Sequence, residues 1–259
     1  MGIDFNHKRN GLGMEIDPRL IEAFRSRVKG QVPPKGGHDG GVGHWLERQF
    51  GIKANGNNKA DIYGWELKTG ARSKTTFGDW TPRRTIYQKG GQINRTEFLH
   101  IFGAPNEKKN NRYSWSGKPS PNIKGWNDFG QRLIVDKENN IVALYSWSQD
   151  KRLDKDKIVP QELRLENLEL AFWPAGDMSG KVHRKFNQKG WFVCLRDESG
   201  AYFEMGFGEP FNFEVFIDGV KTGDIYFDCG MYETNPRPYS QWRANNNVFW
   251  HPRIVRRIR

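Results

Sequence analysis

The sequence predicts a mixed α/β protein of the α+β kind. Apolar residues recur at helical spacing near the N-terminus, and alternating apolar runs bounded by turn residues recur from residue 132 onwards. At 259 residues the chain can bury a core as one large domain or as two lobes. Its 10 Trp, 17 Phe and 8 Tyr supply aromatic surface for that core and exclude a disordered chain.

Two helices are predicted in the first fifty residues. Asp17-Pro18 has the residue types of a helix N-cap and first helical position, and apolar residues follow at helical spacing. A second amphipathic pattern covers residues 42–50, and Gly51 ends it. The stretch between these helices, residues 29–41, is rich in Gly and Pro and is expected to be a connector.

Strand patterns dominate the rest of the chain. Hairpins are predicted over 132–147 and 191–205, since each has two apolar runs separated by polar turn residues. A further strand is predicted over 225–232. Helices are predicted over 162–171, where Leu alternates with Glu, and over 211–220.

The composition limits the classes of partner and location. The net charge of +11 favours an anionic partner, and the basic residues alternate with aromatic and amide side chains, as on nucleic-acid-binding surfaces. No run approaches 18 apolar residues and no apolar signal region is present, so we expect a cytoplasmic protein without membrane contact. Cys194 and Cys229 lie in apolar runs, and the six His residues are scattered, which argues against a zinc site.

One short motif carries chemistry. Asp61 is followed by Glu66 and Lys68 in a segment, 61–68, that is predicted to be a strand. Because successive strand side chains point to opposite faces, Glu66 and Lys68 share one face and Trp65 and Leu67 the other. Two carboxylates beside an ammonium suit a hard divalent cation.

The motif predicts metal-dependent cleavage of a nucleic acid. Mg²⁺ keeps several waters and needs only one or two protein carboxylates, so Asp61 and Glu66 are the predicted ligands, with the Leu67 carbonyl as a third oxygen. Lys68 is predicted to orient the attacking water or to stabilise charge in the transition state. Three cations that follow this motif, Lys74, Arg83 and Arg84, are predicted to contact phosphates.

These residues resemble a known nuclease family. Gly-Val-Gly-His-Trp-Leu-Glu-Arg at 41–48, then Asp61, then Glu66-Leu67-Lys68-Thr69, is similar to the core of the MutH and MvaI/BcnI nucleases, a branch of the PD-(D/E)xK nucleases. Residues 131–147 resemble the central hairpin of that family. Residues 224–232 are similar to the strand that leads into the MvaI recognition loop.

The resemblance implies a restriction-endonuclease-like mixed central sheet flanked by helices, with two lobes that form a DNA-binding cleft. We place a mainly catalytic lobe at 1–170 and a mainly DNA-recognition lobe at 171–259. The resemblance also implies Mg²⁺ dependence, a monomer with one active site, and a cognate DNA methyltransferase in the host. It assigns metal binding to Asp61 and Glu66, catalysis to Lys68, and a place at the edge of the site to Glu47.

The predicted recognition segment, 235–247, departs from the family. The MvaI-type loop is rich in Lys and His, whereas this segment contains Arg, Gln and Asn. Arg suits guanine, and Gln and Asn suit adenine. The candidates for contact with DNA in this segment are Arg237, Tyr239, Gln241 and Arg243.

Two other functions are compatible with the sequence. A MutH-like repair nuclease has the same catalytic residues but nicks one strand. A DNA-binding module without catalysis needs the basic surface but has no need of Asp61, Glu66 and Lys68 together. Our prediction is a type II restriction endonuclease that cleaves specific sites in double-stranded DNA.

Overall fold

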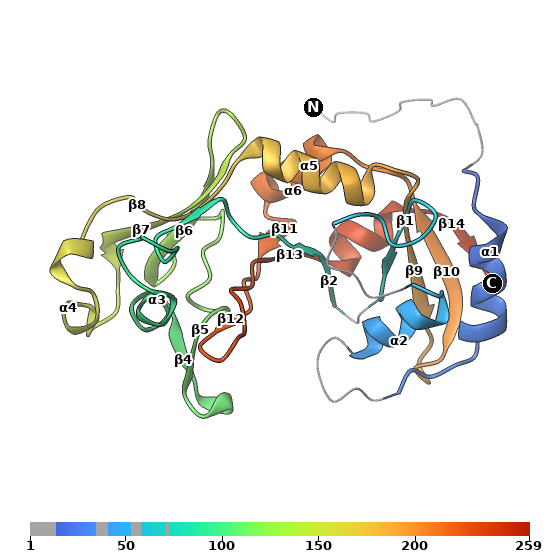
Figure 1. Ribbon diagram of the computed structural model, residues 1–259, viewed down its shortest axis with the longest axis horizontal. Helices are drawn as coiled ribbons and strands as arrows, with labels where there is room; N and C mark the ends of the chain where they lie inside the picture. The colour runs from blue at the N-terminus through green and yellow to red at the C-terminus, as the bar shows by residue number, and fades with distance from the viewer. Residues whose placement is uncertain (1–13, 35–40, 53–57, 71–72) are drawn as a thin grey trace.

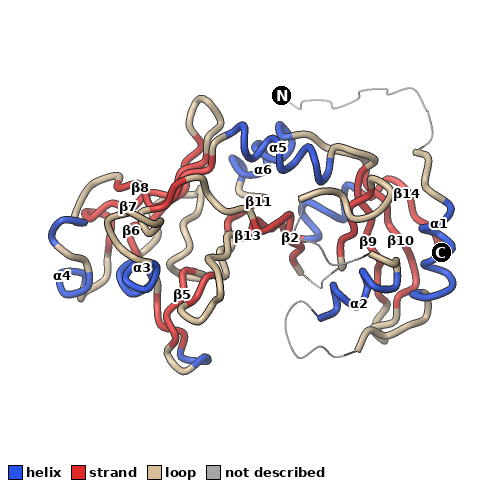
Figure 2. Tube along the Cα trace, in the orientation of Figure 1, coloured by secondary structure: helices blue, strands red, loops and turns tan. Residues whose placement is uncertain are grey.

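The computed structural model describes residues 14–34, 41–52, 58–70 and 73–259. Parts of the predicted connector (35–40) and of the loop before Asp61 (53–57) lie outside these ranges. The molecule is elongated, with a strand-rich body at each end and the helices α5 and α6 near its middle (Figures 1 and 2). Among the described residues no helix is long and apolar enough to cross a membrane.

One end of the molecule contains a four-stranded sheet, here called the β1 sheet. Its strands in spatial order are β1 (Trp65–Lys68), β9 (Gly190–Arg196), β10 (Tyr202–Gly208) and β14 (Ile254–Ile258). Strand β1 pairs with β9 in parallel, and the other pairings are antiparallel. Trp65 and Leu67 belong to the same apolar core as residues of the two N-terminal helices, α1 (Pro18–Ala23) and α2 (Gly41–Gln49).

The other end is built from two antiparallel sheets, here called the distal sheets. They pack with the helix α3 (Arg95–Phe102) around a core that includes Phe98, Trp115 and Tyr145. The strands of the first sheet are β3 (Arg84–Thr85), β8 (Leu168–Trp173), β7 (Ile141–Asp150) and β6 (Phe129–Val135). Those of the second are β12 (Met231–Tyr232), β5 (Arg112–Trp115) and β4 (Ala104–Asn106).

A three-stranded sheet, the bridging sheet, joins the two ends (Figure 1). Its order is β11 (Ile225–Phe227), β13 (Gln241–Asn245) and β2 (Lys74–Asp79). One face is apolar: Phe77, Trp242 and Phe227 lie in the core that also takes up the buried sides of α5 (Ala175–Phe186) and α6 (Phe213–Thr222). The opposite face is polar and carries Gln241 and Arg243 of β13.

Short helical segments complete the fold. The π-helical segments are η1 (Phe24–Val28) and η4 (Asn246–Trp250). The remaining turns of helix are η2 (Glu107–Lys109), α4 (Lys155–Ile158), η3 (Gln161–Leu163) and η5 (His251–Arg253).

Several sequence predictions are confirmed. Asp17 caps α1 by accepting the Arg19 N–H at 3.0 Å, and α2 lies within one residue of its predicted bounds. Both predicted hairpins form, as β6–β7 and β9–β10, and α6 occupies the stretch predicted as 211–220. Both cysteines are buried and free.

Other element predictions are wrong or incomplete. Residues 162–171 are not a helix: after a short 3-10 turn the chain enters β8, whose pairing with β3 and β7 overrides the helical propensity of its Leu and Glu residues. The strand predicted over 225–232 is divided into β11 and β12, and Gly230 between them has a φ of 71°. Helix α5 was not predicted.

The predicted division at residue 170 does not coincide with the sheets. The β1 sheet takes β1 from before that position and β9, β10 and β14 from after it. The distal sheets likewise combine β3 to β8 with β12. The chain therefore crosses between the two ends more than once, and the division into a catalytic lobe and a recognition lobe stays a prediction.

Candidate active site

Asp61 lies on a tight turn directly before β1. Tyr63 and Gly64 have φ values of 50° and 82°, and this turn lets Ile62 bridge to Trp65. The predicted strand over 61–68 is therefore wrong in its first half, because strand pairing begins only at Trp65. The turn nevertheless brings the acid to the strand: Asp61 Oδ2 accepts the Leu67 N–H at 2.9 Å. The role of the Leu67 carbonyl stays a prediction.

Glu66 and Lys68 share one face of β1, as alternation predicts. The Lys68 ammonium donates to Glu66 Oε1 at 2.8 Å, while Trp65 and Leu67 lie in the core on the other face. The Lys68 ammonium also donates to the carbonyl oxygens of Thr76 at 2.8 Å and Phe77 at 3.4 Å on β2. These backbone contacts fix the position of Lys68 independently of Glu66.

A second lysine joins this pair. Lys185, in the last turn of α5, places its Nζ 3.1 Å from Glu66 Oε1. The sequence analysis missed it, because α5 was not predicted and because 119 positions along the chain separate Lys185 from Glu66. Both ammonium groups thus contact the same carboxylate oxygen.

The other oxygen of Glu66 has no partner. Oε2 is buried and makes no hydrogen bond within the described residues. Burial raises the pKa of Glu66 from its ordinary 4.5 to about 7, although the charges of Lys68 and Lys185 act in the opposite direction, and Asp61 adds to the increase. Burial lowers the pKa of Lys68, an effect that Glu66 opposes. Burial of a carboxylate whose second oxygen has no hydrogen bond among the described residues thus outweighs the two ammonium groups on its first oxygen.

These features fit a divalent cation. Among the residues that the structure describes, no three His, Cys, Asp or Glu side chains gather as a ready-made metal centre. A catalytic Mg²⁺ needs fewer, since water fills the rest of its octahedral shell. A buried orphan oxygen on Glu66, with Asp61 close enough to influence its pKa, is the donor set that such an ion requires.

Glu47 marks the approach to the site. It lies on α2, 3.1 Å from His44 Nδ1, and its charge helps to raise the pKa of Lys185. Side-chain exposure increases from Glu66 (2%) through Lys185 (18%) to Glu47 (31%). The more exposed side of the site is thus the side of Lys185 and Glu47, and the role of Glu47 at the edge of the site stays a prediction.

The bridging sheet gathers several of the predicted DNA contacts on its polar face. Gln241 and Arg243 alternate along β13, and the Arg243 Nε donates to Gln241 Oε1 at 3.1 Å. Lys74 on β2 pairs with Asp228 at 2.6 Å, and Arg243 lies 3.4 Å from the same carboxylate. The structure adds Asp228 as a shared partner, which the sequence analysis did not anticipate.

The segment between β12 and β13 is held by another acid. Asp79 at the end of β2 forms an ion pair with Arg237 at 2.6 Å, and its Oδ1 accepts the Ser240 N–H at 2.6 Å. The Arg237 guanidinium lies 4.7 Å from the ring centroid of Tyr239. Arg237 itself is 57% exposed, so its outer surface is available to a ligand.

The other two predicted phosphate contacts are also ion-paired. Arg83 pairs with Asp177 on α5, at 2.8 Å from Nε to Oδ2, and Arg84 pairs with Glu169 on β8 at 3.1 Å. Both arginine side chains remain more than half exposed. Arg83 thereby connects the segment after β2 to the helix that carries Lys185.

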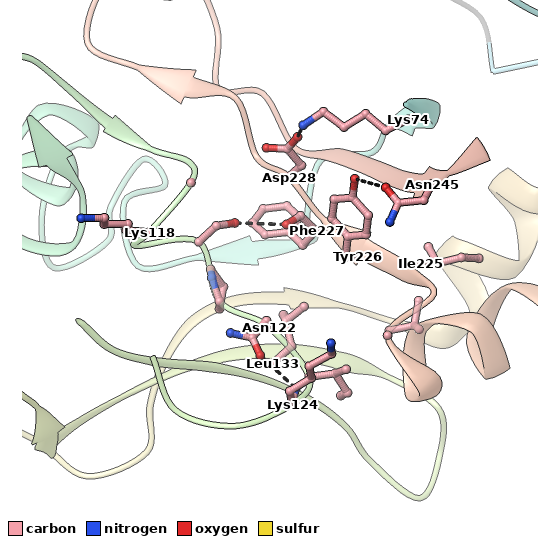
Figure 3. A pocket seen from close by; sticks show the side chains of 16 residues that line it. Lys74, Lys118, Asn122, Lys124, Leu133, Ile225, Tyr226, Phe227, Asp228 and Asn245 are labelled. Carbon is pink, nitrogen blue, oxygen red and sulfur yellow. Dashed lines mark hydrogen bonds and ion pairs between the residues drawn. The ribbon is translucent and has the colours of Figure 1, made fainter. Parts of the chain in front are cut away.

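A cavity of about 580 Å³ lies at the edge of the bridging sheet (Figure 3), and Glu66 is not among its lining residues. Lys74, Asp228, Tyr226 and Asn245 line it from the polar face, and the Tyr226 hydroxyl lies 3.5 Å from Asn245 Oδ1. Residues 117–124 from the distal end, including two lysines, line its other side. The cavity therefore extends the polar face toward the distal end of the molecule.

Comparison with known proteins identifies the family. The family model of the LlaMI restriction endonuclease matches residues 26–258, which is most of the chain. The chain belongs to the LlaMI restriction endonuclease family. It is 45% identical over 262 residues to the type II restriction enzyme ScrFI of Lactococcus lactis subsp. cremoris, a match that spans 92% of this chain and 96% of that protein.

A solved structure supports the fold of this restriction endonuclease. The MvaI restriction endonuclease in complex with its cognate DNA matches with a TM-score of 0.59 at 14% identity, covering 92% of this chain and 96% of that one. At this identity the match speaks for the fold only. It confirms the predicted restriction-endonuclease-like architecture of mixed sheets and helices.

Proposed function

We propose that this chain is a type II restriction endonuclease that hydrolyses phosphodiester bonds at specific sites of double-stranded DNA with Mg²⁺. The observation that carries the proposal is the state of the buried Glu66: its Oε2 has no hydrogen-bond partner among the described residues, its Oε1 contacts two ammonium groups, and Asp61 is close enough to affect its pKa. A purely DNA-binding module gains nothing from a buried carboxylate whose pKa is raised, since such a group costs folding free energy.

Each residue then has a defined task. Asp61 and Glu66 would hold the metal, which would neutralise charge on the phosphate and activate a water. Lys68, fixed by the Thr76 and Phe77 carbonyls, presents a positive charge where negative charge develops. Glu47 lies at the solvent side of the site, where the DNA backbone arrives.

The polar face of the bridging sheet is proposed to contact DNA. Gln241 and Arg243 offer paired donors and acceptors for base edges, and Lys74 and Arg237 offer charge for phosphates. Tyr239, Arg83 and Arg84 complete the proposed surface. The carboxylates of Asp228 and Asp79 hold these cations in place before DNA binds.

The test is digestion of a fully sequenced bacterial genome, followed by mapping of the fragment ends. We expect double-strand ends at one short sequence, produced only with Mg²⁺. Asp61→Ala should cleave at least about 10²-fold more slowly, as when one electrostatic contact in a transition state is lost, but should still bind DNA. Asp218→Ala, an exposed residue on α6, is the matched control and should cleave normally.

Other outcomes would exclude the proposal. Equal survival of DNA with the parent protein and Asp61→Ala in Mg²⁺ would leave a DNA-binding module. On supercoiled plasmid, an open circle that never becomes linear would instead indicate a MutH-like nicking enzyme. The monomeric state, the cytoplasmic location and the partner methyltransferase remain predictions, and light scattering of the purified protein tests the first.

A further inference from the structure

The side chain of Lys185 interacts with several acidic residues of the candidate active site. Its Nζ lies 3.1 Å from Glu66 Oε1, and the carboxylates of Glu66, Asp61 and Glu47 all act on it. Burial works against its charge, but these three acids outweigh burial and raise the pKa of Lys185. The Lys185 ammonium thus contacts one carboxylate of the site and is influenced by the charges of two others.

The two lysines of the site are held differently. Lys68 donates to two backbone carbonyls as well as to Glu66, so it stays in place without the carboxylate. Glu66 is the hydrogen-bond partner of the Lys185 side chain within the described residues. Lys185 is also the more exposed of the two, at 18% against 8% for Lys68. Of the two lysines, Lys185 is therefore the one whose ammonium can move away from Glu66.

From this geometry we propose that Lys185 is a positioning residue that takes the place of the divalent cation in the metal-free enzyme. Its ammonium holds Glu66 at Oε1 and gives up this contact when the metal binds. The inference rests on the proposed function, because it assumes that Asp61 and Glu66 hold the metal. It goes further by making metal binding a competition with a side chain of this chain.

The position of Lys185 in the fold also links the candidate active site to the proposed DNA surface. Helix α5 follows β8 of a distal sheet directly and precedes β9 of the β1 sheet. Near the start of α5, Asp177 pairs with Arg83, one of the proposed phosphate contacts. Lys185 therefore lies at the end of a helix whose other end is linked to the proposed DNA surface.

The experiment measures binding of Mg²⁺ alone to the full-length, DNA-free protein by isothermal titration calorimetry. Lys185→Met removes the charge and keeps the length of the side chain. It should bind Mg²⁺ about tenfold more tightly than the parent protein, because a competing unit charge is gone. Lys185→Arg keeps the charge and should retain the parent affinity. Lys181→Met, one turn earlier on α5, is the control and should also leave the affinity unchanged.

A merely structural role for Lys185 predicts the opposite pattern. The Lys185→Met protein would then melt at a lower temperature and bind Mg²⁺ with equal or weaker affinity, which overturns the proposal. Should Lys185→Met fail to fold, the NMR signals of ¹³Cε-labelled lysines in the parent protein replace it, with Lys185 assigned through Lys185→Arg. Addition of Mg²⁺ should shift the Lys185 signal, and an unchanged signal would also overturn the proposal.

Failure of this inference is distinguishable from failure of the proposed function. A parent protein that cleaves DNA with Mg²⁺ while Lys185→Met binds the ion no more tightly refutes the competition alone. A parent protein that neither binds Mg²⁺ nor cleaves DNA refutes both.

Discussion

Two buried glutamates in the β1 sheet have pKa values that are shifted in opposite directions. Glu204 on β10 and Glu66 on β1 are 3% and 2% exposed, and each contacts two cations. Glu204 uses both oxygens: Oε1 accepts from Arg257 at 2.6 Å and Oε2 from Arg259 at 2.9 Å. Glu66 contacts both of its lysines through Oε1, and its Oε2 has no hydrogen-bond partner in the part of the chain that the structure describes.

The pKa values follow this geometry. For Glu204, burial would raise the pKa, but the hydrogen bonds and charges of Arg257 and Arg259 lower it overall. For Glu66, burial dominates and raises the pKa to about 7. The two side chains have similar exposed fractions and an equal number of cations, but Glu204 lies close to the surface beside largely exposed arginines, whereas Glu66 is deeply enclosed; one is a satisfied structural acid and the other is not. The unsatisfied acid, Glu66, belongs to the motif of Asp61, Glu66 and Lys68. The difference therefore indicates that this motif forms a ligand-binding site.

Substituting the unsatisfied acid should have the largest effect on the reaction. Glu66→Gln keeps the shape but removes a proposed metal ligand, so we expect cleavage to slow by about 10²-fold or more. Glu204→Gln should leave the cleavage rate unchanged, because its strand is separated from β1 by β9. The comparison is measured by single-turnover plasmid cleavage with both variants. Equal losses of rate would contradict the assignment of different roles.

The same pair differs in how stability depends on pH. Between pH 4.5 and about 7 the folded metal-free protein keeps a proton on Glu66 that the unfolded chain has released, so this group makes stability fall as the pH rises. The free energy of unfolding of Glu66→Gln, relative to the parent protein, should therefore increase across this window by up to about 3 kcal/mol. Urea denaturation at a series of pH values measures this difference. A difference that stays flat with pH would show that Glu66 is charged and satisfied.

Glu204 should behave in the opposite sense. Its pKa is lowered, so its contribution to stability is present above the unfolded value of 4.5 and is lost as the pH falls below it. At pH 8, Glu204→Gln should lose about 1–2 kcal/mol, the order of two charge-assisted hydrogen bonds to largely exposed arginines. Thermal and urea denaturation at pH 8 measure the loss. An unchanged stability would mean that solvent screens both ion pairs completely.

The local part of this site could be predicted from the sequence. Alternation along Trp65-Glu66-Leu67-Lys68 correctly separates the charged face from the core face, because strand periodicity is a property of the backbone. The Asp17 cap and the two hairpins were predictable for the same reason, since the interactions that form them span only a few residues.

The nonlocal part could not be predicted. Lys185 reaches Glu66 from a helix far along the chain, and α5 contains two Gly and only a narrow apolar stripe of Met178, Val182 and Phe186. That stripe becomes informative only when the core is known. The acids that pair with the predicted DNA contacts, such as Asp228 directly after β11 and Asp79 at the end of β2, likewise meet their partners only in the folded bridging sheet.

The smallest predicted effect comes from making Glu204 resemble Glu66. Arg259→Met removes the partner of Oε2 and leaves Arg257 on Oε1, which reproduces the one-sided contact seen at the active site. Arg259 is 78% exposed, so we expect a loss of less than about 1 kcal/mol at pH 8, measured by urea denaturation, with unchanged cleavage. Water can replace the lost guanidinium at Glu204, whereas the enclosed Oε2 of Glu66 lacks such access. A loss of several kcal/mol would show instead that a carboxylate with a partner on only one oxygen destabilises the fold even near solvent. Burial would then no longer explain why the pKa of Glu66 is raised.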